Sequence, residues 1–400
     1  MIYTLYCRIY QNVFKWVSYL MPFQKPTLIE GQGSLSKLPD IVLRNGIYNV
    51  IVVTDRVIVS LGLVDSLLEG LVAKGVKYVI YDGTVPNPTI DNIEEALVLY
   101  NTNKCQAIIA FGGGSAMDCA KGVAARLARP NKTIPQLKGV LKVRKAIPKL
   151  FAIPTTSGTG SEATLAAVIT NSLTHEKYAI NDTVLIPHYA VLDPILTLAL
   201  PQHITSTTGM DALTHAVEAY IGKSNTAETK AMSKAAVKLI MDNLYEAYSN
   251  GTNIVARENM QKASYYAGIA FTRAYVGYVH AIAHTLGGFY NIPHGLANAV
   301  ILPYVLKSYG ASAHQKLSEL EDWVSTEIKQ ESTEKKANRF IDRIITLNHS
   351  MNIPNKITGI KDEDLALMVE RAFHEANPLY PVPKIFTRDD LMAVYNTMKG

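Results

Sequence analysis

The chain has 400 residues, of which 48% are hydrophobic and 18% are charged, and its formal net charge is +5. This is the composition of an ordinary globular protein of two or three domains, and so mild a charge gives no argument for nucleic-acid binding. The three cysteines are odd in number and form no CxxC pair, which fits a reducing compartment and predicts a cytoplasmic protein.

The first 23 residues are apolar and aromatic, but polar and charged side chains such as Arg8 and Lys15 interrupt them. No run of about 18 apolar residues remains for a membrane span, and no signal-peptide cleavage site follows. Tyr6, Tyr10 and Phe14 recur at helical spacing, so we expect an amphipathic helix. Packing on the protein's own surface or in a subunit interface is favoured over peripheral membrane contact, because so few positive charges are present.

Short apolar runs alternate with helical patterns from residue 48 to residue 153. The expected strands are residues 49–53, 78–81, 106–111 and 150–153, and the expected helices are residues 64–74, 90–101 and 116–127. This alternation is typical of βαβ units and predicts a parallel sheet.

The third strand runs directly into the sequence GGGS at residues 112–115, and a helix follows. A glycine-rich turn lets the backbone approach a ligand closely, and the first N–H groups of the helix form an anion site suited to a pyrophosphate. The sequence is not the GxGxxG fingerprint, and the acidic residue at a strand end, Asp55, precedes the glycines. We therefore expect a nucleotide-binding sheet with a different layout.

Asp55 has two interpretations. Its carboxylate can cap the following helix, or it can accept hydrogen bonds from a ribose hydroxyl of NAD. The second interpretation favours NAD over NADP, because a carboxylate repels a 2′-phosphate.

Residues 154–162, PTTSGTGSE, are dense in hydroxyls and glycine. One interpretation is a capped helix start, since Ser157 or Thr159 precedes Glu162 at about the spacing of a capping box. The other is a polar wall that donates hydrogen bonds to a ligand, and both can hold together.

After residue 200 the pattern becomes helical to the end of the chain. The expected helices are residues 209–220, 226–248, 256–271, 276–286, 311–328, 334–347, 361–375 and 388–399. We therefore expect an N-terminal extension at residues 1–25, an α/β domain at residues 26–200 and an all-helical domain at residues 201–400.

Three histidines fall within residues 280–294. His280 and His284 stand four apart, so a helix would place them on one face. Glycines and a proline then interrupt the pattern, so His294 can return from a turn toward the same point. A second pair, Asp211 and His215, has the same spacing. A carboxylate and several imidazoles on two helices suit a divalent transition metal, although spacing does not say which of the three later histidines bind it.

Four motifs together resemble the iron-containing, or group III, alcohol dehydrogenases, and the similarity covers residues 26–400. The motifs are GGGSAMDCAKG at 112–122, PTTSGTGSEAT at 154–164, GMDALTHAVEAY at 209–220 and HAIAHTLGGFYNIPHG at 280–295. The resemblance implies an α/β dinucleotide-binding domain followed by an all-helical domain, the fold shared with dehydroquinate synthase.

The resemblance also implies a site. The metal ligands it implies are Asp211, His215, His280 and His294. His284 would stand by the nicotinamide and the substrate as a proton-relay or positioning residue, and Phe271 would line the substrate pocket. The pyrophosphate would be held by Gly113, Gly114 and Ser115 with Asp118. Other cofactor contacts would come from Asn87, Thr155, Thr156, Thr159 and Lys177.

The implied activity is a metal-dependent alcohol dehydrogenase or aldehyde reductase, which transfers a hydride between NAD(H) and a short-chain alcohol, diol or aldehyde. Either Fe²⁺ or Zn²⁺ fits one carboxylate and three imidazoles, and the cation would act as a Lewis acid. Asp211→Asn or His280→Ala would then abolish metal retention and activity.

The expected partner is a small alcohol or aldehyde, and a homodimer or higher homo-oligomer is expected. No nucleic acid is expected, because the basic run at residues 138–149 has no interleaved aromatic side chains to stack on bases. Two alternatives are a glycerol-type zinc dehydrogenase and a dehydroquinate synthase-like lyase. The lyase would need basic residues at the metal, where residues 271–295 offer only Arg273. A third is a metal-binding protein without activity.

Overall fold

The structure is a computed structural model that describes residues 2–21, 23–172, 176–325 and 330–400. The chain forms two compact units. One is an α/β unit of residues Pro22–Ala199, and the other is a helical unit that joins Met1–Met21 to Leu200–Gly400. The N-terminal segment therefore packs with the C-terminal half of the chain.

The α/β unit is built on a six-stranded parallel sheet with the order β1-β9-β6-β4-β2-β3. Its strands are β1 (Thr27–Glu30), β2 (Asn49–Val53), β3 (Lys77–Tyr81), β4 (Ala107–Gly112), β6 (Lys149–Pro154) and β9 (Tyr189–Leu192). A smaller sheet contains β5 (Gly139–Val140), β8 (Lys177–Asn181) and β7 (Ala166–Thr170).

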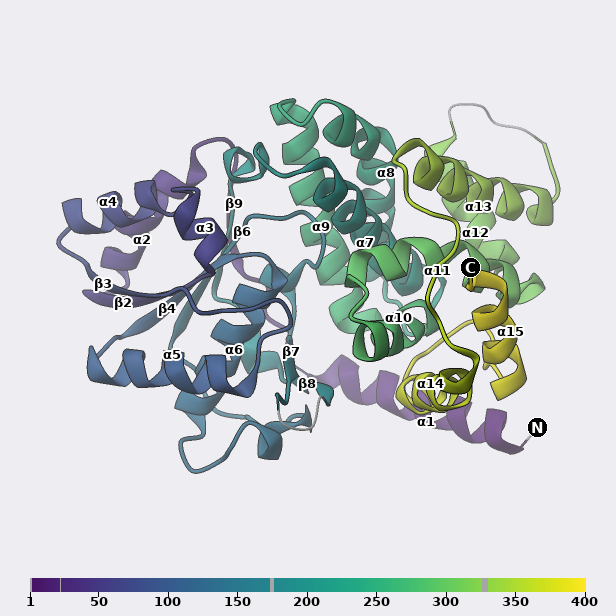
Figure 1. Ribbon diagram of the computed structural model, residues 1–400, viewed down its shortest axis with the longest axis horizontal. Coiled ribbons are helices and arrows are strands. Elements are labelled where there is room, and N and C mark those ends of the chain that lie inside the picture. Colours follow the sequence, from purple (N-terminus) through teal and green to yellow (C-terminus); the bar gives the residue numbers. More distant parts are fainter. Residues whose placement is uncertain (1, 22, 173–175, 326–329) are drawn as a thin grey trace. The chain divides into compact units, whose positions relative to one another are not determined.

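Helices cover both faces of the large sheet. They are α2 (Leu38–Arg44), α3 (Arg56–Ser60), α4 (Asp65–Ala73), α5 (Ile90–Thr102) and α6 (Gly114–Ala128), with short 3₁₀ turns η1 (Ser34–Lys37), η2 (Pro135–Leu137), η3 (Ser161–Ala163), η4 (Thr183–Leu185) and η5 (Pro194–Thr197). Figure 1 shows α2 and α4 on one face and α5 and α6 on the other. Val50 and Val52 of β2 pack in the core on the first face, and Ile51 and Val53 pack in the core on the second. Burial on both faces explains why this strand is a continuous apolar run.

The strand order reverses between β2 and β4. From β2 the chain steps outward to β3, and from β4 it steps the other way, to β6 and then to β9. In open parallel sheets, ligands bind outside the carboxyl ends of the strands at such a switch point. Asp55 follows β2 and Gly113 follows β4, so both lie at this position.

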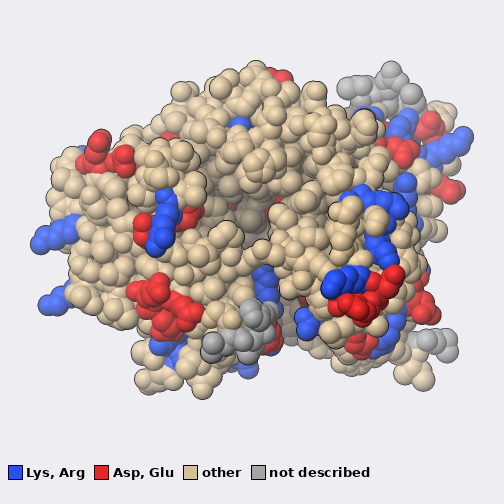
Figure 2. All heavy atoms as spheres, viewed as in Figure 1, with Lys and Arg blue, Asp and Glu red and all other residues tan. Residues whose placement is uncertain are grey.

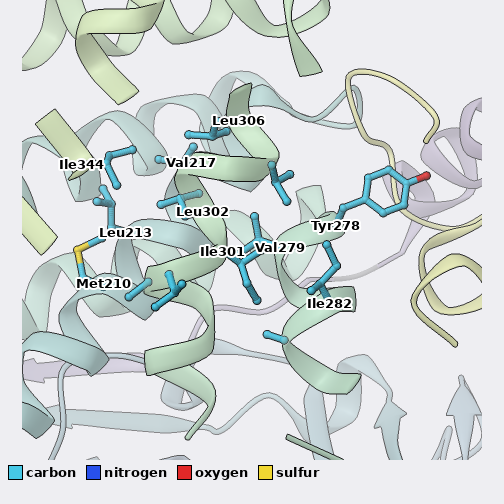
Figure 3. Packing of buried hydrophobic residues seen from close by; sticks show 14 of the residues in the cluster. Met210, Leu213, Val217, Tyr278, Val279, Ile282, Ile301, Leu302, Leu306 and Ile344 are labelled. Atoms are coloured by element: carbon cyan, nitrogen blue, oxygen red, sulfur yellow. The ribbon is translucent and has the colours of Figure 1, made fainter. Parts of the chain in front are cut away.

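The helical unit consists of ten helices among the described residues. They are α1 (Ile2–Leu20), α7 (Gln202–Ile221), α8 (Ala227–Ser249), α9 (Ile254–Ala274), α10 (Tyr278–Tyr290), α11 (His294–Tyr309), α12 (Ala311–Val324), α13 (Thr333–Ser350), α14 (Asp362–Ala376) and α15 (Arg388–Met398). Figure 3 shows apolar side chains of α7, α10, α11 and α13 packed together, among them Leu213, Val279, Leu302 and Ile344. This core fixes the helices that carry the histidines.

The N-terminal helix α1 is anchored by partly buried polar contacts. Arg8 donates to the carbonyl oxygens of Val382 at 2.8 Å and Pro383 at 2.9 Å. Gln11 donates to the carbonyl oxygens of Pro378 and Tyr380 at 3.1 and 2.7 Å. Among the helices the structure describes, α1 included, none combines the length and apolar character that a bilayer crossing demands.

Several helix boundaries differ from the sequence predictions, and the helix α11 (His294–Tyr309) was not predicted. The helix α7, expected at residues 209–220, begins at Gln202. The helix α10 does not break at Gly287 and Gly288 but continues to Tyr290 and ends at Asn291, which is left-handed with φ 54°. His294 does not lie in a loop, because it is the first residue of α11. The last residues of the helix expected at 311–328 lie outside the described part of the chain.

On the face that Figure 2 shows, Lys and Arg side chains lie among Asp and Glu side chains. Charges of both signs that alternate in this way partly cancel one another's field.

Candidate metal centre and nucleotide site

A carboxylate and two imidazoles meet in the core of the helical unit. Asp211, His215 and His280 each offer a ligand atom, and these atoms all lie within 4.8 Å of one another. Asp211 and His215 occupy one face of α7, and His280 lies near the start of α10. All three residues are buried.

His294 lies at the edge of this group. Its Nε2 is 3.6 Å from Oδ1 of Asp211, and its ring centroid is 5.3 Å from that of His280. Gly295 permits this position, because a Cβ there would come within 2.4 Å of the carbonyl oxygen of Thr207 on α7. A larger residue would push the first turn of α11, and His294 with it, away from α7.

Glu218 determines which nitrogen of His280 faces the group. Its carboxylate accepts hydrogen bonds from Nδ1 of His280 at 2.6 Å and from the backbone N–H groups of Gly277 and Val279 at 2.8 and 2.9 Å. Burial raises the pKa of Glu218 to about 8, and the hydrogen bonds from Gly277, Val279 and His280 oppose this rise, because they stabilise the ionised carboxylate. Beside the ionised carboxylate Nδ1 of His280 is the donor and its Nε2 carries a lone pair, which is the arrangement found behind metal-bound histidines.

His280 is held in its neutral form. Its burial, reinforced by the neighbouring His215 and His294, lowers its pKa well below the ordinary value. A neutral imidazole is the form that binds a metal ion.

Asn298 lies among the ligand atoms. Its Nδ2 is 2.6 Å from Oδ1 of Asp211, 3.3 Å from Nε2 of His280 and 3.1 Å from Nε2 of His294. Three acceptor atoms from three helices thus point at the amide group of Asn298, which is itself buried. Converging acceptors of this kind need a positive partner, so the donor set fits a divalent cation.

An aromatic ring covers one side of the group. Phe271 of α9 stacks on His215 with ring centroids 4.1 Å apart, and His215 stacks on His280 at 4.5 Å. Phe271 is only partly buried, so its ring forms an apolar wall beside the candidate ligands.

His284 lies one turn after His280, with its ring stacked on His294 at 5.2 Å. Its Nδ1 is 2.6 Å from Oε1 of Glu375 on α14. The same Oε1 accepts a hydrogen bond from the hydroxyl of Tyr380 at 3.0 Å. His284 therefore lies beside the candidate metal ligands, and its hydrogen-bond partner is a separate carboxylate, that of Glu375.

In the α/β unit, Asp55 and the glycine turn come together at the switch point. A Cβ on Gly112, whose φ is +151°, would meet Ala116 at 2.9 Å and Oδ2 of Asp55 at 3.7 Å. Oδ1 of Asp55 accepts hydrogen bonds from the N–H groups of Val57 and Ile58 at 2.9 and 3.0 Å. The capping interpretation of Asp55 is therefore confirmed, and Oδ2 is not used in the cap.

The helix α6 begins without a side-chain cap and without an acidic residue in its first turn. A Cβ on Gly114 would lie 2.7 Å from Thr159, and one on Gly113 would lie 3.5 Å from Thr156. Bare backbone at the start of a helix, narrowed by two threonines, is a cradle that fits a pyrophosphate.

The neighbouring predicted residues join this cradle. The hydroxyl of Ser115 accepts a hydrogen bond from the N–H of Asn87 at 3.3 Å, and Asn87 is left-handed with φ 59°. The N–H of Thr155 donates to the carbonyl oxygen of Gly112 at 3.0 Å. The predicted cofactor residues of the two strand ends therefore lie together.

Asp118 points into the protein. Its two carboxylate oxygens accept from the hydroxyl of Ser161 and the N–H of Val168, each at 3.1 Å. Burial raises its pKa to about 6, and the positive charges of Lys121 and Lys177 oppose that rise. These bonds join α6 to the hydroxyl-rich segment at residues 154–162, here called the polar loop, and to β7.

Several residues of both sites were missed from sequence. Glu218, Asn298 and Glu375 hold candidate site residues, and so does Lys121, a buried lysine. Its Nζ donates to the hydroxyls and carbonyl oxygens of Ser161 and Thr164, and burial lowers its pKa to about 8. Helical spacing could have identified three of them, because Asn298 follows His294 by four residues, and Lys121 and Glu218 follow Asp118 and His215 by three. Glu375 has no such signal.

Two family models match most of the chain. The model described as "Iron-containing alcohol dehydrogenase" matches residues 26–194. The model described as "Fe-containing alcohol dehydrogenase family, C-terminal" matches residues 205–398.

Individual proteins agree with this match. Alcohol dehydrogenase 4 of Schizosaccharomyces pombe is 38% identical over 375 residues, which cover 92% of this chain and 86% of that protein. The 1,3-propanediol dehydrogenase of Klebsiella pneumoniae is 35% identical over 389 residues, which cover 96% of this chain and 98% of that protein. A crystal structure of sulfoacetaldehyde reductase from Bifidobacterium kashiwanohense in complex with NAD⁺ superposes with a TM-score of 0.84 at 28% identity, covering 94% of this chain and 98% of that one.

Proposed function

This chain belongs to the iron-containing alcohol dehydrogenase family, and we propose that it interconverts a short-chain alcohol or diol and its aldehyde, with NAD(H) as the hydride carrier. The observation that carries the proposal is the convergence of Asp211, His215 and His280 on one buried point. The curated relatives, one named an alcohol dehydrogenase and one a 1,3-propanediol dehydrogenase, support the substrate class.

In the helical unit, Asp211, His215, His280 and His294 would hold Fe²⁺ or Zn²⁺. Glu218 would hold His280 through Nδ1, and Asn298 would hold the Asp211 carboxylate through Oδ1. When bound, the metal would polarise the substrate oxygen, and NAD(H) would supply or take up the hydride. The protein would keep the imidazole rings of the ligand histidines neutral and hold them in a fixed orientation.

Phe271 and His284 would contact the bound substrate. The ring of Phe271 would contact the carbon chain of an alcohol, which excludes water from that side. His284 would accept the proton of the substrate hydroxyl in oxidation or return it in reduction. It lies next to the ligand His294 and is more exposed than His280.

In the α/β unit, the pyrophosphate would lie on the bare N-terminus of α6 at Gly113, Gly114 and Ser115. Thr156 and Thr159 narrow this cradle. Thr155, Asn87 and Lys177 would supply further contacts to the cofactor near it. We propose that Asp118 acts through its bonds to Ser161 and Val168, which hold the polar loop, because its negative charge would repel a phosphate.

The oxygen of Asp55 that is not used in capping would bind a ribose hydroxyl of NAD. The same charge would repel the 2′-phosphate of NADP. The proposed cofactor is therefore NAD.

We also propose a cytoplasmic location. Cys7, Cys105 and Cys119 are all free and buried, which is the state that a reducing compartment maintains.

The test is absorbance at 340 nm with NADH or NADPH and a panel of short aldehydes, after reconstitution with Fe²⁺ or Zn²⁺ in the absence of oxygen. We expect metal-dependent oxidation of NADH by a short aldehyde, and its loss, with loss of bound metal, in Asp211→Asn. Glu258→Gln is a control, because Glu258 lies on α9 and pairs with Lys262 at 2.8 Å. Turnover with retained metal in Asp211→Asn would refute the assignment of the site.

A further inference from the structure

Each of the two histidines on one face of α10 has its Nδ1 at 2.6 Å from a carboxylate. For His280 the carboxylate is that of Glu218, which lies on α7. For His284 it is Glu375, near the end of α14. The second pair is part of no motif in the sequence, and 91 positions separate its members.

We propose that Glu375 is a positioning residue for the reaction. It holds His284 in the tautomer that carries its proton on Nδ1, so that Nε2 presents a lone pair beside the metal centre. The proposal rests on the proposed function, in which His284 exchanges a proton with the substrate hydroxyl.

The donors around Glu375 establish the tautomer. Oε1 of Glu375 accepts from the hydroxyl of Tyr380 at 3.0 Å, and the same oxygen lies 2.6 Å from Nδ1 of His284. An ionised carboxylate only accepts hydrogen bonds, so beside it the hydroxyl of Tyr380 and Nδ1 of His284 are both donors. A neutral imidazole then has its lone pair on Nε2, which is the state that accepts a proton.

Tyr380 is well suited to this role, because it is partly buried and packs against the core of the helical unit. Burial raises its pKa well above the ordinary value, so its hydroxyl keeps its proton. Tyr380 therefore remains a hydrogen-bond donor to Glu375.

The N-terminal helix supports the segment that carries Tyr380. Gln11 donates to the carbonyl oxygens of Pro378 and Tyr380, and Arg8 donates to those of Val382 and Pro383. Four hydrogen bonds from α1 thus fix the backbone of residues 378–383. The helix α1 precedes residue 26, where the match to the family model begins.

Loss of Glu375 would free the imidazole of His284. The ring could then rotate or move its proton to Nε2, and part of the population would present an N–H where the reaction needs a lone pair. Loss of the carboxylate behind a metal-bound histidine costs about 10–100-fold in affinity or activity, and we expect a loss of the same order for the proton-exchanging His284. Because the effect falls on proton exchange, kcat should fall while KM changes little.

The first readout does not depend on activity. The full chain is labelled with ¹⁵N at histidine Nδ1, loaded with Zn²⁺ and measured by magic-angle-spinning NMR, which separates protonated from unprotonated ring nitrogens. The signal of His284 is assigned by its absence in His284→Gln. We expect a protonated Nδ1 in the wild type and in Glu375→Gln, whose amide oxygen still accepts, and a partly unprotonated Nδ1 in Glu375→Leu.

The second readout is steady-state kinetics of the same proteins. Glu375→Leu should lower kcat about 10–100-fold, and Glu375→Gln should recover most of the loss. Glu370→Gln is a matched control. Glu370 lies on α14 and also contacts a histidine, His374 at 2.7 Å, but that pair is exposed on the surface. It should leave both the NMR signal and kcat unchanged.

Gln11→Leu tests the support from α1 and should lower kcat in the same direction by a smaller factor. If Glu375→Leu does not fold, Glu375→Ser carries the same test, because its short side chain cannot reach Nδ1. An unchanged His284 signal and unchanged kcat in the variant that folds would overturn the proposal. Failure of the proposed function looks different, because the metal-loaded wild type would then turn over no aldehyde while the NMR signals still separate.

Discussion

At the residue scale, the site depends on pairs of side chains whose partners are far apart in the chain. Glu218 and His280 are 62 positions apart, and Glu375 and His284 are 91 apart. The i,i+4 spacing of Asp211 and His215 revealed candidate ligands because one helix brings them together. No spacing rule reveals a carboxylate on another helix, so the residues that orient the imidazoles became visible only in the fold.

Asp55 shows how one residue can serve structure and specificity at once. Its Oδ1 caps α3, and its charge is proposed to reject NADP. The variants Asp55→Asn and Asp55→Ala separate these roles. Both remove the charge, so kcat/KM for NADPH should rise relative to NADH in both. Only Asp55→Ala loses the cap, which should cost about 0.5–2 kcal/mol in the free energy of unfolding.

The measurements are cofactor kinetics at 340 nm and urea unfolding. An unchanged preference for NADH over NADPH in both variants would show that Asp55 serves only as a cap.

At the scale of elements, the sequence predicted most of the regular structure but not the helix α11. The buried parallel strands were recognisable as apolar runs, and β2 has the predicted bounds, Asn49–Val53. The expected break at Gly287 and Gly288 was wrong, because a glycine in a helix costs only about 1 kcal/mol and packing readily outweighs that. The chain turns instead at Asn291, whose left-handed conformation ends α10.

The close approach of α11 to α7 gives a test at this scale. Gly295→Ala would place a Cβ 2.4 Å from the carbonyl oxygen of Thr207. We expect the first turn of α11 to move and His294 to leave the metal centre. Affinity for Zn²⁺, measured by chelator competition, should fall while the far-UV circular dichroism spectrum stays the same.

Gly288→Ala is the matched control, because Gly288 is exposed in α10 and no atom lies within 4 Å of the added Cβ. It should keep full metal affinity and raise the free energy of unfolding by about 0.5–1 kcal/mol. Equal metal affinity in the two variants would show that α11 tolerates the added methyl group.

The junction of β6 and β9 should make stability depend on pH. Nδ1 of His188 accepts a hydrogen bond from the N–H of Leu150 at 3.2 Å. Burial, with the nearby charge of Lys149, lowers the pKa of His188 to about 4, from an ordinary value of 6.5. Between these two values the unfolded chain binds a proton that the folded chain does not. Stability is therefore lost as the pH falls from 6.5 to about 4.

Urea unfolding at pH 7 and pH 5 checks this prediction. The wild type should lose more stability on acidification than His188→Asn, whose amide oxygen can accept the same hydrogen bond without taking up a proton. His349→Asn, at an exposed position near the end of α13, should behave like the wild type. If His188→Asn loses as much stability as the wild type, another group is responsible.

At the scale of the whole molecule, the two ligands are proposed to bind to different units. The metal ligands all belong to the helical unit, and the nucleotide cradle belongs to the α/β unit. The sequence indicated this division through its change from alternating strands and helices to helices alone. It did not indicate that α1 belongs with the C-terminal helices, because the contacts of Arg8 and Gln11 are to backbone atoms, which leave no pattern in side-chain types.

This division can be tested with the two native tryptophans. The chain contains two, Trp16 on α1 and Trp323 on α12, and both belong to the helical unit. Trp323 contacts Tyr220 of α7 edge-on, with ring centroids 4.5 Å apart, so its fluorescence reports on the helix that carries Asp211 and His215. Zn²⁺ at 100 times its Kd should raise the free energy of unfolding seen by fluorescence by about 2.7 kcal/mol.

A chelator should remove that gain, and Asp211→Asn should show none. The α/β unit has no tryptophan, so its unfolding changes the circular dichroism but not the fluorescence. NADH should stabilise this unit and shift that part of the circular dichroism transition to higher urea concentration. If the units unfold in one cooperative step, fluorescence and circular dichroism will coincide and both ligands will shift them together. A Zn²⁺-induced gain of the same size in Asp211→Asn would place the metal elsewhere.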